Sequence, residues 1–102
     1  MKEFKEVLAF VAEEMENAEE YAGEAAKHRE QYPELAALYF RCAVDCDTHA
    51  EILCKHAWTM VEACEQKHSE HALWMRHVWE YAREMRMKRA EHVKHLLDMY
   101  KG

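Results

Sequence analysis

The sequence predicts an all-α protein, an antiparallel three-helix bundle that dimerises. Two observations lead to this prediction. Only two glycines and one proline interrupt the 102 residues, and apolar residues recur every three or four positions along most of the chain. Half of the residues are hydrophobic and a third are charged, as in folded domains. A chain of this length supports one core, so we expect residues 1–102 to form a single domain.

Three helices are expected, over about residues 2–31, 33–67 and 70–100. Pro33 suits a first helical position, because the N–H that proline lacks would have no partner there. The chain therefore reverses at Gln31–Tyr32, and the first two helices are antiparallel neighbours. Residues 65–70 (EQKHSE) are polar, and Ser69 can cap a new helix. We favour a break near Lys67–Ser69 over one continuous helix of ~100 Å, which only an intertwined oligomer could bury.

Each expected helix has an apolar stripe, and the second helix has two. The stripe of the first helix narrows to alanine: Phe4, Val7, Leu8, Val11, Met15, Ala18, Ala22 and Ala25. The main stripe of the second helix is Leu35, Tyr39, Cys42, Cys46, His49, Leu53, His56 and Met60, and its other stripe is Phe40, Val44, Cys54, Trp58 and Val61. The third helix has His71, Met75, Val78, Ala82, Met85, Arg89, His92, Leu96 and Met99, flanked by Trp74, Trp79 and Tyr81. A helix that is apolar on two sides lies between partners, so we expect a homodimer or a higher homo-oligomer.

Charge and cysteine usage exclude several classes of protein. The formal charge is −6, with ten acids against four bases in residues 1–34 and five acids against seven bases in residues 68–102. This pattern lacks the concentrated basic face of a nucleic-acid binder. No segment is apolar enough to span a membrane, and the start MKEFKE does not resemble a signal peptide. The four cysteines fall in one predicted helix, where they are poorly placed to pair, so we expect free thiols in the cytoplasm.

Polar residues within the apolar stripes give the candidate site. With the chain folded back near Tyr32 and Lys67–His68, four potential ligands should lie within about one turn of each other: Glu14, Cys46, His49 and His92. A carboxylate, a thiol and two imidazoles suit one divalent metal, zinc or iron. The alternative is structural. Arg89 would then pair with Glu14, tyrosine hydroxyls or carbonyls would satisfy the histidines, and the cysteines would pack as small apolar side chains.

Residues 32–53 (YPELAALYFRCAVDCDTHAEIL) resemble the second helix of the rubrerythrin and wider ferritin-like families. The likeness lies in a tyrosine-led turn, a run of the type LAALF and the end of a Glu-x-x-His-Ala motif at His49-Ala50. Glu14 followed by Tyr21 resembles the first-helix ligand and tyrosine of those families. The resemblance implies a di-iron site with Glu14 and His49 as ligands. Cys46 and Arg89 stand where its two motif glutamates would be, so two bridging carboxylates and a fourth helix are missing, and we do not expect di-iron oxidase or peroxidase activity.

Two functions follow as hypotheses. The first is a non-catalytic assembly or interaction module that has a ferritin-like hairpin and a degenerate iron site. The second is a metal-binding or redox protein that uses Glu14, Cys46, His49 and His92. A cysteine beside a histidine also suits nucleophilic catalysis, but the sequence offers no glycine-bearing loop to build an oxyanion site, so we name no catalytic residue.

Overall fold

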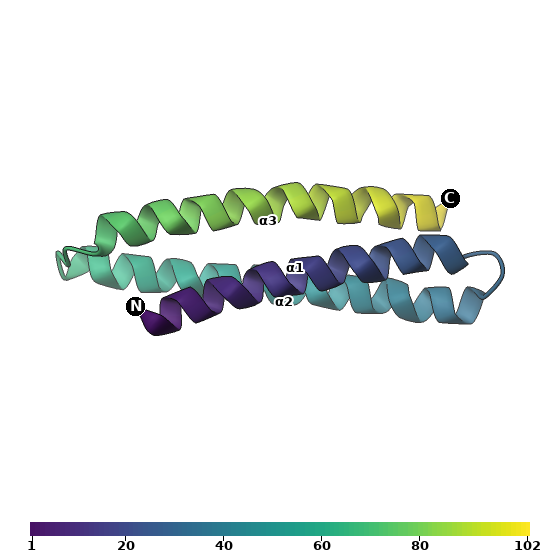
Figure 1. Cartoon of the computed structure of the whole chain (residues 1–102), viewed down its shortest axis with the longest axis horizontal. Helices are drawn as coiled ribbons and strands as arrows, with labels where there is room; N and C mark the ends of the chain where they lie inside the picture. Colours follow the sequence, from purple (N-terminus) through teal and green to yellow (C-terminus); the bar gives the residue numbers. More distant parts are fainter.

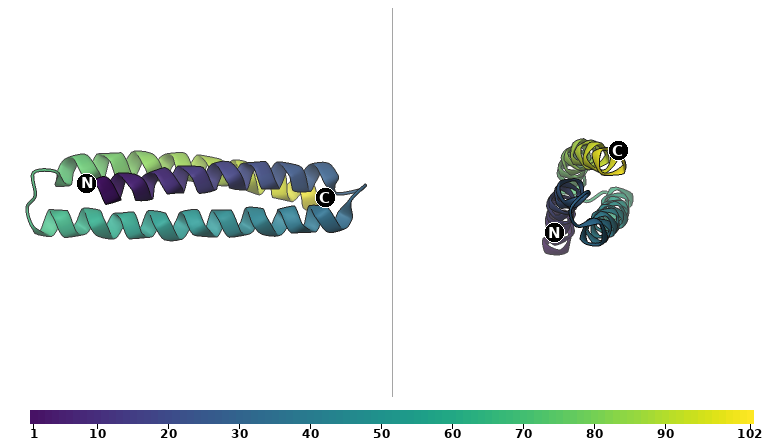
Figure 2. Two further views of the ribbon diagram at one scale, coloured as in Figure 1. Left: turned by 60° about the horizontal axis from the view of Figure 1, so that its bottom comes forward. Right: turned by 90° about the vertical axis from the view of Figure 1, so that its right-hand side faces the viewer.

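The computed structural model describes all 102 residues and consists of three α-helices joined by two short turns (Figure 1). They are α1 (Lys2–His28), α2 (Pro33–Gln66) and α3 (Ala72–Lys101). The bundle measures 56 × 18 × 15 Å, and α2 runs antiparallel to the other two helices (Figures 1 and 2). The predicted all-α three-helix bundle is confirmed. Dimerisation stays a prediction.

The predicted helix boundaries shift by a few residues at the turns. α1 ends at His28 and α2 at Gln66, whereas α3 begins only at Ala72. The predicted break near Lys67–Ser69 is present, although no glycine marks it. The N–H of Ser69 donates to the carbonyl of Cys64 (3.0 Å), and that of His68 donates to the carbonyl of Glu65 (3.1 Å). His68 has a φ of 53°, so a histidine occupies the left-handed position that glycine usually takes in this helix-ending motif.

The centre of the bundle is an alanine stripe on α2 that packs against α1. Four fully buried alanines recur at intervals of seven residues: Ala36, Ala43, Ala50 and Ala57. α1 contributes fully buried alanines of its own at Ala18, Ala22 and Ala25. Small side chains on both helices let the two backbones approach closely, and α1 packs more extensively against α2 than either helix packs against α3.

The main apolar stripe predicted for α2 is therefore not the side of the helix that faces the core, and this prediction is wrong. Tyr39, Cys42, Cys46, Leu53 and Met60 are half-buried at the flank of the alanine stripe, and His49 and His56 are exposed. The alanines occupy the inner position because they lie between the two predicted stripes. Of the large side chains in those stripes, only Cys54 and Val61 are buried.

The predicted stripe of α3 faces the other two helices at most of its positions, but α3 is only loosely packed. Met75, Val78 and Leu96 pack in or against the core, whereas His71, His92 and Met99 are exposed. Met75 and Val93 are its only buried residues. Trp79 anchors the helix by donating its indole N–H to the carbonyl of Cys54 (3.0 Å). Arg86 reaches Glu51 of α2 at only 3.8 Å, and its Nε is buried without a hydrogen-bond partner. An arginine at this position limits how tightly α3 can close on the other two helices, because burying its charge is costly.

None of the three helices combines the length and the hydropathy needed to cross a bilayer.

Gly23 offers a test of the fold, because it lies inside α1 with open space where a Cβ would be. We expect Gly23→Ala to raise the free energy of unfolding by about 1 kcal/mol, since glycine lowers helix propensity by that amount. The melting temperature should rise by about 4–8 °C, as measured by circular dichroism. The matched control is Gly102→Ala at the chain end, where φ is +89° and the Arg29 guanidinium lies 2.7 Å from the point that a Cβ would occupy. This control should give no gain, and an unchanged melting temperature for Gly23→Ala would contradict the packing described for α1.

Candidate functional site

Three of the four predicted site residues come together on the outer side of the α1–α2 pair. The Glu14 carboxylate lies 3.1 Å from Nδ1 of His49, and Glu14 also acts on the nearby Cys46 thiol. We call these three residues the Glu14 cluster. Because an ionised carboxylate only accepts hydrogen bonds, Nδ1 of His49 is the donor to Glu14, and in the neutral imidazole Nε2 then keeps a free lone pair. The His49 side chain is 58% exposed, so this nitrogen is open to solvent.

The Cys46 thiol is held in its protonated form. Burial raises its pKa to about 11, and the negative charges of Glu14, Cys42 and Asp45 add to that shift. The thiolate is the nucleophile and the metal ligand, so Cys46 is unreactive at neutral pH unless a cation displaces the proton. The thiol of the unfolded chain ionises first, so between pH 9 and about 11 the free energy of unfolding should fall.

The fourth predicted residue, His92, belongs to a separate group between α1 and α3. Its Nδ1 lies 2.7 Å from Oε2 of Glu19, and Nε of Arg89 lies 3.4 Å from the other oxygen of the same carboxylate. Arg89 also donates to the backbone carbonyl of Ala12 (3.4 Å). We call Glu19, Arg89 and His92 the Glu19 cluster. Nδ1 of His92 is the donor to Glu19 for the same reason, and the His92 side chain is 55% exposed.

Helix geometry explains why the four predicted residues do not meet. Glu14 and Glu19 are five residues apart, so they point about 140° from each other around α1. Glu14 therefore faces α2 and Glu19 faces α3. Across the whole chain, no group of three or more histidine, cysteine, aspartate or glutamate side chains is arranged to hold a metal ion.

The sequence-based alternative placed Arg89 with Glu14, and this pairing is wrong, because Arg89 binds Glu19. That alternative also gave the histidines tyrosine or carbonyl partners, whereas His49 and His92 each bind a glutamate. The sequence analysis does not single out Glu19, which binds both His92 and Arg89 in the structure. Its spacing from Glu14 was the available signal, since five residues place a side chain on the opposite flank of a helix.

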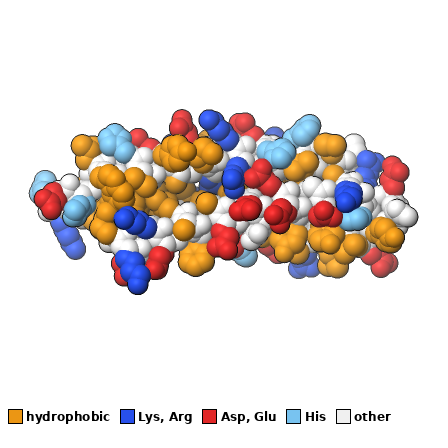
Figure 3. All heavy atoms as spheres, viewed as in Figure 1, with side chains coloured by type: hydrophobic (Ala, Val, Ile, Leu, Met, Phe, Trp, Pro, Cys, Tyr) orange, Lys and Arg blue, Asp and Glu red, His pale blue; other side chains and the backbone are white.

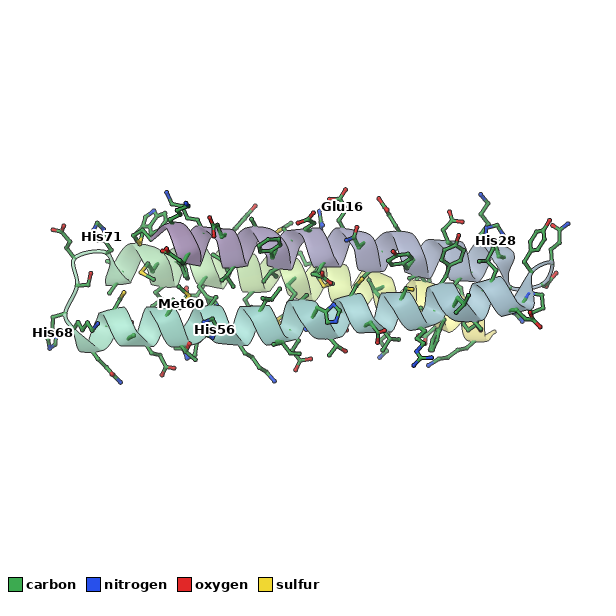
Figure 4. All side chains as sticks on the ribbon, turned by 90° about the horizontal axis from the view of Figure 1, so that it is seen from below. Glu16, His28, His56, Met60, His68 and His71 are labelled. Carbon is green, nitrogen blue, oxygen red and sulfur yellow. The ribbon has the colours of Figure 1, made fainter.

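Aromatic side chains pack together toward the end of the α1–α2 pair where the chain turns between the two helices. Tyr39 stacks on Tyr21 and on His28, with ring centroids 6.1 and 6.0 Å apart. His28 also lies 2.9 Å from Glu24. Figure 4 places His28 at this end of the bundle, and His68 and His71 at the opposite turn. These histidines are thus far from the Glu14 cluster and add no ligand to it.

A groove of about 410 Å³ lies on another side of the bundle, between α1 and α3. Nine of its twelve lining residues are hydrophobic. In the space-filling view, hydrophobic side chains gather over the first halves of α1 and α3, and acidic side chains follow farther along α1 (Figure 3). The molecule therefore presents an apolar groove and two polar clusters on its surface.

The pKa of Cys46 gives a direct test of the Glu14 cluster. We expect Glu14→Gln to lower this pKa, because the substitution removes the carboxylate charge beside the thiol. At pH 8 the rate of alkylation of Cys46 by iodoacetamide should then rise ~3–10-fold, as measured by mass spectrometry of the peptide. Glu16→Gln is the matched control, because the exposed Glu16 points away from α2 (Figure 4). Equal rates in the two variants would show that Glu14 does not act on the thiol.

Comparison with protein-family models, with characterised proteins and with solved structures finds no match to this chain. The resemblance to ferritin-like proteins therefore remains a prediction from the sequence motifs, and the functional proposals below rest on the geometry of the chain itself.

Proposed function

We propose that this chain is a non-catalytic assembly or interaction module, which works by presenting apolar helix surface to other protein chains. In this proposal the likeness to ferritin-like proteins is one of fold. Cys46 and Arg89 replace two carboxylates that would bridge iron, so the iron site is degenerate. The observation that supports the proposal best is the amount of apolar surface left uncovered.

The accessible surface area of the chain is 7037 Å². A typical monomeric protein of 12.2 kDa exposes about 6,100 Å², so the excess is roughly 900 Å². A standard protein–protein interface covers about 800 Å² of each partner. The extra surface of this bundle is therefore close to what one interface would bury.

Large hydrophobic side chains contribute to this surface. Only 14 of the 102 residues are buried, and thirteen large hydrophobic side chains are exposed. Tyr81 is 66% exposed, and Trp74, Met85 and Phe10 are also exposed. Contiguous apolar surface of this kind marks interaction sites in soluble proteins.

Self-association is the first form of interaction to test. We expect sedimentation velocity of the untagged, reduced chain to show a dimer or a larger species at micromolar concentration, because the free surface matches one interface. The species should shift toward monomer on dilution. A strictly monomeric chain across the concentration range would contradict the homo-oligomer.

A second candidate function is binding of one divalent metal, zinc or iron, and the His–Glu pairs favour it. Metal-ligating histidines typically donate one ring N–H to a carboxylate and bind the metal through the other nitrogen. His49 with Glu14, and His92 with Glu19, have this arrangement. In this proposal Cys46 supplies a thiolate beside His49, and the remaining ligands come from a second copy of the chain.

Metal binding predicts a stoichiometry. The wild-type chain is incubated with Zn²⁺ and desalted, and elemental analysis should then find about one zinc per site formed by Cys46 and His49. This zinc should be lost in both Cys46→Ala and His49→Ala, because each variant removes a ligand. His95→Ala is the matched control, since His95 is exposed and lies outside both clusters. Zinc that persists in both ligand variants, or a wild-type chain that retains none, would rule out this site.

A further inference from the structure

We propose that the groove between α1 and α3 binds an amphipathic α-helix from a different protein, with acidic residues flanking the apolar face of that helix. This inference rests on the proposed role as an interaction module, and it names the groove and the chemistry of the partner.

The floor of the groove suits the apolar face of a helix. Leu8, Val11 and Met15 line it from α1, and Val78 and Met85 line it from α3. The lining residues span positions 5–15 of α1 and 78–89 of α3, or about 15 Å of helix, the length of three turns. Because α1 and α3 run in the same direction, the groove has the shape that a further helix would fill in a four-helix bundle.

The rim of the groove carries only positive charge. Its three charged lining residues are Lys5, Arg86 and Arg89, and no acid lines it. Lys5 lies at one end over the Trp74 ring, 5.6 Å from its centroid, and both arginines lie at the other end. A bound helix with an acid at each end of its apolar face would meet a cation at both ends.

Arg86 is not fully satisfied within the chain, whereas Arg89 already binds Glu19. Arg86 has its nearest acid at 3.8 Å and a buried Nε without a hydrogen-bond partner. Such buried donors are costly to leave unpaired. A carboxylate from a bound helix would place a second acid beside the Arg86 guanidinium, and the helix would cover the apolar floor.

A second copy of the chain fits this groove poorly. If two copies met groove to groove, Lys5, Arg86 and Arg89 of each would lie against the same three cations of the other. Like charges across an interface disfavour association. Self-association through other exposed apolar residues remains compatible with the groove binding a different chain.

The test uses labelled synthetic peptides of about 14 residues, roughly four helical turns. One has leucines at helical spacing flanked by glutamates, the second has lysines in place of the glutamates, and the third is a scrambled form of the acidic peptide. Fluorescence anisotropy with the full chain should show that the acidic peptide binds at least about tenfold more tightly than the other two, and that its affinity falls as salt is raised.

Variants locate the binding. Lys5→Glu and Tyr81→Ala should each weaken binding of the acidic peptide by about five- to tenfold. The first variant reverses a rim charge, and the second removes the exposed Tyr81 ring, which also lines the groove. The matched controls are Lys94→Glu and Leu73→Ala, at exposed positions of α3 outside the groove lining, and they should bind as wild type. Circular dichroism confirms that each variant is folded.

Three outcomes would overturn the proposal. The acidic and basic peptides could bind equally well, or neither groove variant could weaken binding of the acidic peptide. The third outcome is that the acidic peptide fails to bind and Tyr81→Ala dissociates a dimer of the chain. The last outcome would assign the groove to a second copy. Sedimentation of the unlabelled chain measures self-association separately. A chain that still dimerises but does not bind the acidic peptide would therefore refute only the groove proposal.

Discussion

The close approach of α1 and α2 is the constraint on which the rest of the structure depends. Alanines on α2 face alanines on α1, so the two backbones lie near each other and larger side chains must point to the flanks. This pairing places Glu14, Cys46 and His49 at one edge of the interface instead of inside it. It also makes the core narrow, because alanine buries little apolar area compared with leucine or phenylalanine. The stability of the bundle must then come from a few larger anchors, chiefly Phe4, Met15 and Val61.

α3 is held differently, through contacts near its two ends and through Val93, which is buried in the main core cluster. Near its start, Met75 packs with Phe4 and Val61, and the Trp79 indole packs against Trp58 in a tilted arrangement, with centroids 4.6 Å apart. Near its end, Tyr100 stacks on Phe40 at 5.1 Å, and Arg29 donates to the carbonyl of Met99. Between these ends lie Arg86 and Arg89, whose charges keep the helix from closing further. The open groove between α1 and α3 is a consequence of that arrangement.

The number of helices and their approximate limits could be predicted because they depend on local features, such as Pro33, the polar run at 65–70 and the lack of internal breakers. The inner face of α2 could not, because three adjacent stripes compete on that helix and hydrophobicity favours the larger residues over alanine. Only the tertiary contact with α1 makes alanine the better inner residue. The site was predicted in part, because Glu14 and His49 do meet. His92 binds Glu19 instead of Glu14. The prediction compared only the heights of residues along the bundle, and height does not show which side of α1 each glutamate faces. The left-handed conformation of His68 could not be predicted either, because glycine usually occupies that position in this helix-ending motif.

The Glu19 cluster shares Arg89 with the groove, whereas the Glu14 cluster shares no residue with it. Arg89 lines the groove and also binds Glu19, so an acidic side chain bound there would compete with Glu19 for the guanidinium. Glu19 would then interact mainly with His92. The Glu14 cluster faces α2 on the other flank of α1 and contributes no residue to the groove. Binding in the groove would thus be coupled directly to the Glu19 cluster, through Arg89, and only through the α1 backbone to the Glu14 cluster.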